Sequence, residues 1–222
     1  MARCTSCSAP LPANTNYCNY CNTRSDVDLN AKLPYKVEKL AAKRVCPNCD
    51  KALQTIRLKM ADPLYIERCH TCFGLFFDKG EIELILQSSV SSVFGINLKH
   101  IDNINKDRYS QPQKIRYLKC PDCRRHMNRV NFGQRSGVVI DQCIVHGIWL
   151  DSGELTHLLE WKKAGGQLLH QQHTADLEKQ QQEQNVLSAF ATDNSANTIG
   201  SFGSSVEINL METVVGLLDK LF

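Results

Sequence analysis

The sequence predicts a small α+β fold that is stabilised by bound metal rather than by one large hydrophobic core. The chain has 222 residues, of which 42% are hydrophobic and only 7% aromatic, so a single large core is not favoured. It contains eleven cysteines, and an odd number argues against a closed disulfide framework. Short β-rich runs separate several of the cysteines, and two of the cysteine-rich segments lead into apolar residues at helical spacing.

The cysteines occur in pairs with two residues between the partners. A tight turn with this spacing aims both sulfurs at one ion, with Zn–S distances of about 2.3 Å. The unpaired Cys143 lies three residues before His146, which completes a sixth pair. The predicted ligands are Cys4, Cys7, Cys18 and Cys21 for a first site, Cys46, Cys49, Cys69 and Cys72 for a second, and Cys120, Cys123, Cys143 and His146 for a third.

Three Zn²⁺ ions therefore account for every cysteine, in two sites with four cysteines and one with three cysteines and a histidine. These are ligand sets of closed structural zinc sites. Buried or redox-active cysteines are the alternative, but a thioredoxin-like reading requires a βαβ pattern around one pair, which is absent. A fourth metal site at His170 and His173 is outweighed by an exposed helix face.

The second and third sites belong to an internal repeat. Nineteen residues separate Cys49 from Cys69, and nineteen separate Cys123 from Cys143. Both copies open with Cys-Pro-x-Cys and close with similar tails, "CHTCFGLFFDKGEIELIL" and "CIVHGIWLDSGELTHLL", once Phe73 is treated as an extra residue in the first copy. Cys72 then aligns with His146, which supports the histidine as a ligand rather than a catalytic base.

The interval inside each copy predicts a β-hairpin. The runs "LQTIRL" and "LYIERC" flank "KMADP" in the first copy, and "RVNF" and "VVIDQC" flank the glycine-containing turn "GQRSG" in the second. Each copy is then a zinc ribbon, in which the metal replaces a core that so few residues cannot supply. The two ribbons either stand apart or pack as a pseudo-symmetric pair.

A helix is predicted after each ribbon. Asp78 and Asp151 are placed at the N-caps, with Glu81 and Glu154 completing capping boxes. Catalytic acid–base use of these carboxylates is the competing interpretation. Phe76 and Trp149 are expected to pack the ribbon onto the helix, although Trp149 is also considered as a platform for base stacking.

The repeat resembles the transcription factor IIB-type zinc-finger family. The motif that carries the resemblance is Cys-Pro-x-Cys, a hairpin, Cys-x-x-Cys or Cys-x-x-His, a glycine, an aromatic residue and Asp-x-Gly-Glu, over residues 46–86 and 120–160. Phe76 stands where the family usually has tryptophan. The resemblance implies zinc binding but no established activity. The N-terminal "CTSCSAPLPANTNYCNYC" resembles the short zinc ribbons found at many protein termini.

The sequence suggests eight consecutive segments. The "KVEKLAAKR" stretch is expected to be helical and basic, the third-site helix to be interrupted near Gly165–Gly166, and the C-terminal helix to be amphipathic. The segments are 1–24 (short zinc ribbon), 25–45 (basic linker), 46–94 (zinc ribbon and helix), 95–119 (connector), 120–165 (zinc ribbon and helix), 166–191 (glutamine-rich helical segment), 192–205 (flexible linker) and 206–222 (amphipathic helix).

The sequence favours a non-catalytic, zinc-binding protein that mediates protein–protein interaction. A regulatory role is also considered. The C-terminal helix is expected to contact a partner protein or a second copy of the chain. Nucleic-acid binding in transcription is the alternative, through the basic face of residues 114–129. No small-molecule substrate is evident. No signal sequence and no run of 18 apolar residues is readable, so we expect the protein in the cytoplasm.

Overall fold

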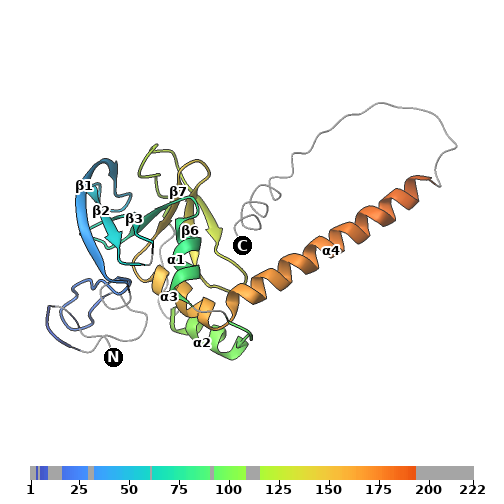
Figure 1. The fold of residues 1–222 in the computed structure, drawn as a ribbon, viewed down its shortest axis with the longest axis horizontal. Coiled ribbons are helices and arrows are strands. Elements are labelled where there is room, and N and C mark those ends of the chain that lie inside the picture. Colours follow the sequence, from blue (N-terminus) through green and yellow to red (C-terminus); the bar gives the residue numbers. More distant parts are fainter. Residues whose placement is uncertain are drawn as a thin grey trace. The chain divides into compact units, whose positions relative to one another are not determined.

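Seven strands form one antiparallel sheet in a computed structural model that describes residues 4, 6–9, 17–29, 33–60, 62–90, 93–108 and 116–193. Residues 1–170 and residues 171–222 form separate units. The strands are β1 (Tyr35–Val45), β2 (Ala52–Leu58), β3 (Leu64–Arg68), β4 (Leu75–Asp78), β5 (Asn128–Asn131), β6 (Val139–Cys143) and β7 (Gly147–Leu150). The helices are α1 (Glu81–Ser89), α2 (Leu98–Arg108), α3 (Glu154–Lys163) and α4 (Gly166–Asp193) (Figure 1).

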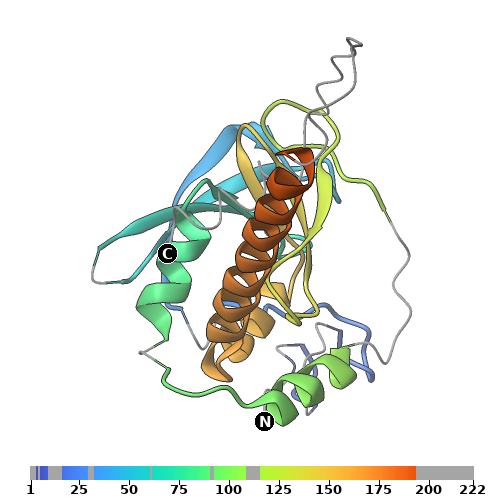
Figure 2. The same cartoon turned by 90° about the vertical axis from the view of Figure 1, so that its right-hand side faces the viewer.

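The two repeats lie side by side in the sheet, whose strand order is β1-β2-β3-β4-β7-β6-β5. Their strands run together in Figure 2 as neighbouring blue-to-teal and yellow ribbons. The repeats join where β4 pairs with β7, in a register that places Phe76 opposite its repeat equivalent, Trp149. Antiparallel pairing of equivalent residues generates an approximate two-fold axis between the repeats, as at an isologous dimer interface. Of the two arrangements considered, the pseudo-symmetric pair is the correct one.

The predicted hairpins are confirmed. Strands β2 and β3 occupy the first pair of β-rich runs, and β5 and β6 occupy the second. Helices α1 and α3 follow their ribbons as predicted, and α3 ends at Lys163 before α4 begins at Gly166, so the interruption at the glycines is also confirmed. The expected connector after the first ribbon contains α2.

The prediction of a helix at "KVEKLAAKR" is wrong. This stretch lies in β1, which pairs with β2 from Tyr35 opposite Leu58 to Val45 opposite Ala52. Its lysines, alanines and leucine favour a helix in isolation, but pairing with an open sheet edge outweighs local propensity. The segment expected to be a basic linker therefore supplies a strand to the sheet.

The sheet separates two hydrophobic cores. On one face, alternate strand residues such as Phe77 and Ile148 pack with residues of α1 and α3, including Ile82 and Leu158. The other face carries a smaller core, in which Phe76, Trp149, Leu53, Leu118 and Met127 lie among the cysteines of the second and third sites.

The expectation that Phe76 and Trp149 pack against the helices is wrong. Successive residues of a strand point to opposite sides, so these rings lie on the metal-binding face while their neighbours Phe77 and Ile148 face the helices. Both rings are fully buried, which also removes Trp149 as a base-stacking platform.

The capping prediction is correct only for the glutamates. The Glu81 carboxylate accepts a hydrogen bond from the backbone N–H of Asp78 at 2.7 Å, and Glu154 does the same for Asp151 at 3.0 Å. The aspartate side chains do not cap the helices. A glycine in the left-handed conformation precedes each helix, with φ of 86° in the first repeat and 92° in the second, and this geometry separates the aspartates from the helix starts.

The actual cap of α3 comes from the segment after the N-terminal knuckles. Asp28 accepts hydrogen bonds from the backbone N–H groups of Gly153 and Thr156, at 2.6 and 2.8 Å. The neighbouring Asp26 forms a buried ion pair with Arg68 of β3. This N-terminal segment therefore contacts both repeats, the first through Asp26 and the second through Asp28.

Residues beyond Asp193, which include most of the predicted linker 192–205 and the whole helix 206–222, lie outside the described part of the chain. Among the described residues, no helix has the length and apolar character required to cross a membrane.

Replacement of Asp28 by alanine is expected to lower the free energy of unfolding by about 1–3 kcal/mol, because two helix N–H groups lose their buried acceptor. Urea unfolding at saturating zinc measures the change. Asp176→Ala, at an exposed position of α4, is the control and should change stability by less than about 0.5 kcal/mol. Equal effects of the two substitutions would contradict the capping role.

Gly74→Ala tests the packing between the repeats. A Cβ atom at Gly74 would lie 2.2 Å from an indole carbon of Trp149, whereas one at Gly95 meets nothing within 4 Å. We expect Gly74→Ala to destabilise the protein by about 1–3 kcal/mol, since the ring is confined on all sides. Gly95→Ala, unfolded in parallel in urea, should have little effect; a harmless Gly74→Ala would show that the ring can move.

Candidate metal centres

All twelve predicted ligands lie in three groups, with the ligand atoms of each group within 4.8 Å of one another. The groups contain the predicted residues: Cys4, Cys7, Cys18 and Cys21; Cys46, Cys49, Cys69 and Cys72; Cys120, Cys123, Cys143 and His146. No other group of this kind occurs among the described residues. His170 and His173 are not brought into a metal-binding cluster.

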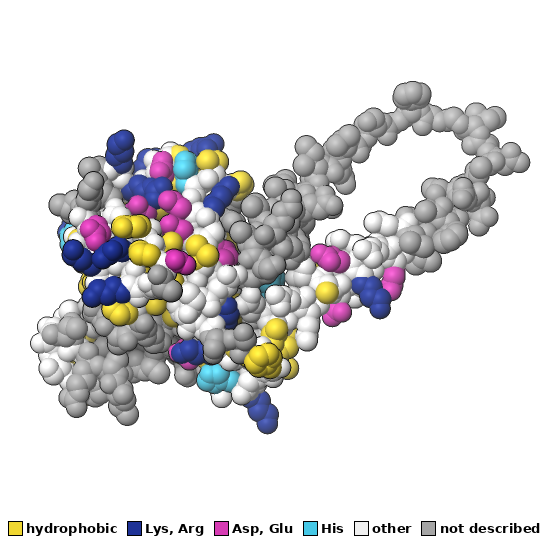
Figure 3. All heavy atoms as spheres, in the orientation of Figure 1, with side chains coloured by type: hydrophobic (Ala, Val, Ile, Leu, Met, Phe, Trp, Pro, Cys, Tyr) yellow, Lys and Arg dark blue, Asp and Glu magenta, His cyan; other side chains and the backbone are white. Residues whose placement is uncertain are grey.

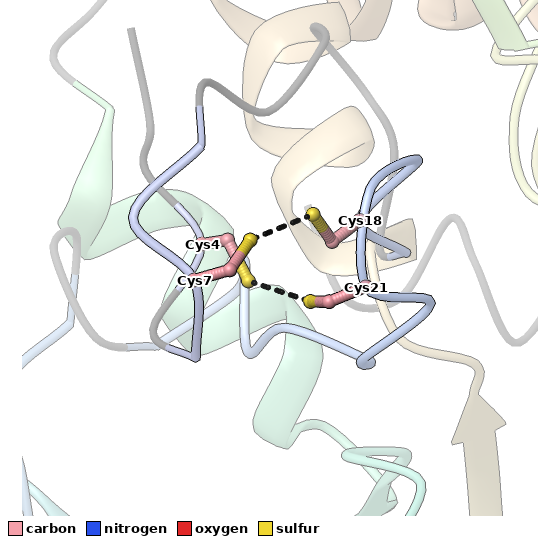
Figure 4. Close-up of side chains that lie close together, drawn as sticks. All are labelled: Cys4, Cys7, Cys18 and Cys21. Carbon is pink, nitrogen blue, oxygen red and sulfur yellow. Dashed lines mark hydrogen bonds between the residues drawn. The ribbon is translucent and has the colours of Figure 1, made fainter.

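The separations between ligand atoms fit zinc. In the first group, Cys7 and Cys18 sulfurs are 3.5 Å apart and Cys4 and Cys21 sulfurs are 3.6 Å apart, and the four side chains converge (Figure 4). A tetrahedral zinc ion with Zn–S bonds of about 2.3 Å spaces its sulfurs by about 3.8 Å. A disulfide would require about 2.05 Å, and all eleven cysteines are free thiols.

The other two groups have similar dimensions. The Cys46 and Cys72 sulfurs are 3.5 Å apart in the second group. In the third group, His146 presents Nδ1 to Cys120 at 3.7 Å and to Cys143 at 3.4 Å. Its Nε2 lies 3.7 Å from a carboxylate oxygen of Asp122. A carboxylate beside the free nitrogen of a ligating histidine helps to fix the ring orientation.

Five of the six ligand pairs share one knuckle geometry. The first cysteine donates its N–H to the carbonyl five residues later and accepts, at its own carbonyl, the N–H of the fourth residue after it. That fourth residue has a positive φ between 52° and 60° in each case. These residues are Ser8, Asn22, Asp50, Phe73 and Arg124.

The sixth pair departs from this geometry. In the second repeat Gly147, with φ of 149°, follows His146 directly and begins β7. In the first repeat Phe73 occupies the left-handed position between Cys72 and Gly74. This accounts for the one-residue gap between the repeats: the cysteine knuckle needs an extra residue before the strand and the histidine version does not. A Cβ at Gly147 would lie 2.0 Å from the Phe77 carbonyl oxygen, so the strand entry requires glycine.

Some of the ligands are held towards the thiolate form that zinc binds, whereas burial raises the pKa of Cys120 to about 12. Hydrogen bonding to the side chain and backbone of Thr23 lowers the pKa of Cys21 to about 6. Hydrogen bonding to the backbone and side chain of Arg125 lowers the pKa of Cys123 to about 6. In the second site, backbone N–H groups of Thr71 and Cys72 point at the Cys69 sulfur, at 3.4 and 3.5 Å.

An ion-pair network links the second and third sites. Arg44 of β1 contacts Glu67 at 2.7 Å, Asp78 at 2.8 Å and Asp122 at 3.1 Å. Its guanidinium also lies over the ring of Phe76, 5.0 Å from the centroid. Sequence reasoning missed this residue, because nothing local marks Arg44 among the basic residues of its segment.

The geometry agrees with the comparison to known families. Residues 45–88 and 119–161 each match the family described as transcription factor zinc-finger. The two matched segments coincide with the two repeats. The predicted resemblance is therefore confirmed for both repeats, and the three ligand groups match three zinc sites, two of four cysteines and one of three cysteines and a histidine. No curated protein and no solved structure shows significant similarity to the chain.

Zinc stoichiometry provides a direct test of the ligand assignment. Native mass spectrometry of fresh, reduced protein should find three zinc ions per chain, and His146→Ala should reduce the number to two, because three cysteines alone leave one coordination position to water. His126→Ala, which removes an exposed histidine beside the same site, should retain three. Two or fewer ions in the unaltered protein, or three in His146→Ala, would refute the assignment.

Proposed function

We propose that the protein is a non-catalytic zinc-ribbon protein that binds another protein, and that its twelve cysteine and histidine ligands hold zinc for structure. Each group supplies four protein ligands, which fill a tetrahedral zinc ion. Catalytic zinc sites keep one position for water or substrate. The complete ligand sets are the observation that carries this proposal, because they leave the metals no position at which to bind a substrate.

The third site presents an apolar surface suited to a protein partner. Ile144 and Val145 form the tip of its second knuckle and are each 56% exposed. Metal ligands on both sides hold this tip, so presenting it costs little conformational entropy on binding. On the face drawn in Figure 3, basic, acidic and apolar side chains are intermixed, which suits a protein surface better than the single sign of charge that phosphates attract.

Nucleic acid remains the second candidate, and one observation favours it. Tyr117 is 72% exposed next to the exposed side chains of Arg116 and Lys119, and Arg124 and Arg125 are exposed on the following knuckle. Basic side chains interleaved with an exposed aromatic ring can bind phosphates and stack on a base. Against this, Arg124 already contacts Asp50 at 3.4 Å.

Affinity purification of the full chain from its native cells distinguishes the two. If Ile144 and Val145 contact a protein, the double variant Ile144→Asp/Val145→Asp should reduce recovery of that protein at least about tenfold, as expected when a buried contact is lost. Leu84→Asp alters an apolar side chain of α1 that is also exposed and should leave recovery unchanged. Zinc content of each variant should stay at three.

The opposite result supports nucleic acid. Retention on DNA or RNA that falls with rising salt and disappears in Arg124→Glu/Arg125→Glu, while Ile144→Asp/Val145→Asp has no effect, would overturn the protein-binding proposal. Loss of partner recovery in Leu84→Asp as well would show that the effect does not come from the knuckle.

A further inference from the structure

The Arg44 guanidinium lies in a cluster of carboxylates around the first repeat. Three carboxylates surround it, from Glu67 on β3, Asp78 at the end of β4 and Asp122 on the knuckle of the other repeat. Several carboxylates so close together would repel one another without the cation, so the arginine neutralises them as well as cross-linking the repeats.

The pseudo-two-fold axis creates a second copy of this environment without the arginine. Asp141 of β6 is equivalent to Glu67, and Asp151 is equivalent to Asp78, since each lies at the same place relative to its ligands. Asn48 stands where the other repeat has Asp122, and its side-chain amide donates directly to Asp151 at 2.7 Å. The position of Arg44, two residues before the first ligand, is taken by Leu118.

Leucine cannot supply the missing charge, and a cavity remains. It has a volume of about 280 Å³, and Asn48, Leu118, Asp141, Asp151 and Glu154 are among its lining residues. Asp141 is only 7% exposed, and its Oδ1 atom is buried without a hydrogen-bond partner. A buried carboxylate oxygen without a donor is costly, so the site lacks a group that its counterpart in the first repeat possesses.

The cavity also has a basic side. Arg24, Arg116 and Arg129 line it. Arg24 donates to the Cys72 carbonyl at 3.1 Å and Arg129 to the Arg116 carbonyl at 3.4 Å, and neither arginine donates a hydrogen bond to Oδ1 of Asp141. Arg129 lies opposite Asp141 in the sheet register and is the competing occupant from the chain itself. A ligand that also carries an anion can pair with these arginines.

We propose that this cavity binds a guanidinium group, placed against Asp141 and Asp151 as Arg44 is placed against Glu67 and Asp78, in a ligand that also presents a carboxylate to the arginines. Free arginine and a C-terminal arginine of a protein chain share this chemistry. Cys49 and Cys72 of the second zinc site also line the cavity, but the guanidinium contacts the carboxylates, and its binding does not depend on the function proposed above.

Isothermal titration of the zinc-loaded full chain with L-arginine tests the proposal. Binding should be one to one, and Asp141→Asn should weaken it at least about tenfold through loss of a charge-assisted hydrogen bond. The matched control is Glu67→Gln, the equivalent change in the first repeat, which should leave arginine affinity unchanged. Leu118→Arg places a guanidinium at the position equivalent to Arg44 and should abolish arginine binding. If Asp141→Asn loses zinc, the Leu118→Arg variant provides the test in its place.

Binding of related ligands tests which chemical groups the cavity recognises and whether the natural ligand is a protein or a metabolite. Citrulline, which has the shape of arginine without the charge, should not bind, and lysine should bind more weakly because its ammonium lacks the planar pair of donors. Agmatine, which lacks the carboxylate, should bind more weakly than arginine. Tighter binding of a peptide with a C-terminal arginine would identify a protein as the source, and tighter binding of free arginine a metabolite. The proposal is overturned if no guanidino compound binds, if citrulline or lysine matches arginine, or if Asp141→Asn and Leu118→Arg leave binding intact.

Discussion

The pairing of β4 with β7 is the interaction on which the arrangement of the repeats depends. It joins strands β1–β4 and strands β5–β7 into one seven-stranded sheet and brings the two equivalent rings, Phe76 and Trp149, into register. A single ribbon exposes both faces of a very short sheet and cannot bury enough apolar surface for stability. Joined edge to edge, the ribbons form a surface wide enough for α1 and α3 to cover on one side. The edge contact also removes two open strand edges that would otherwise be available for aggregation.

Metal and packing stabilise opposite faces of that sheet. On the helix face, aliphatic residues form an ordinary core. On the other face, the second and third zinc groups enclose Phe76 and Trp149, so the ligands are themselves part of the hydrophobic cluster. Folding and metal binding are therefore coupled there, because the cysteines converge only when the rings and both knuckles are in place. The close approach of Gly74 to Trp149 shows how little space this arrangement leaves.

Sequence alone predicted the features that depend on local spacing. Ligand pairs, hairpins and repeat helices are encoded within about twenty residues, and each followed from cysteine spacing or apolar periodicity. The long-range contacts did not follow. Asp28 caps a helix that begins 126 residues later, and β1 adopts a strand although its composition favours a helix. Such contacts depend on which surfaces meet in three dimensions, and a single sequence contains no local signal for them. The aspartate of Asp-x-Gly-Glu was misassigned because a glycine in a left-handed conformation shifts the helix start past it.

The two repeats share one arrangement of strands and ligands but carry different side chains at equivalent positions near the pseudo-two-fold axis. Across the axis, Asn48 can donate to Asp151 directly, but the equivalent Asp122 faces Asp78 with a like charge and requires Arg44 between them. An arginine at position 118 would have reproduced this solution in the second repeat. Leucine there enlarges the metal-side core and leaves Oδ1 of Asp141 without a donor. Burying a carboxylate in this state is unfavourable for stability alone. Its presence at the one place where the other repeat holds a guanidinium is therefore best explained by binding, which supplies the missing donor from outside the chain.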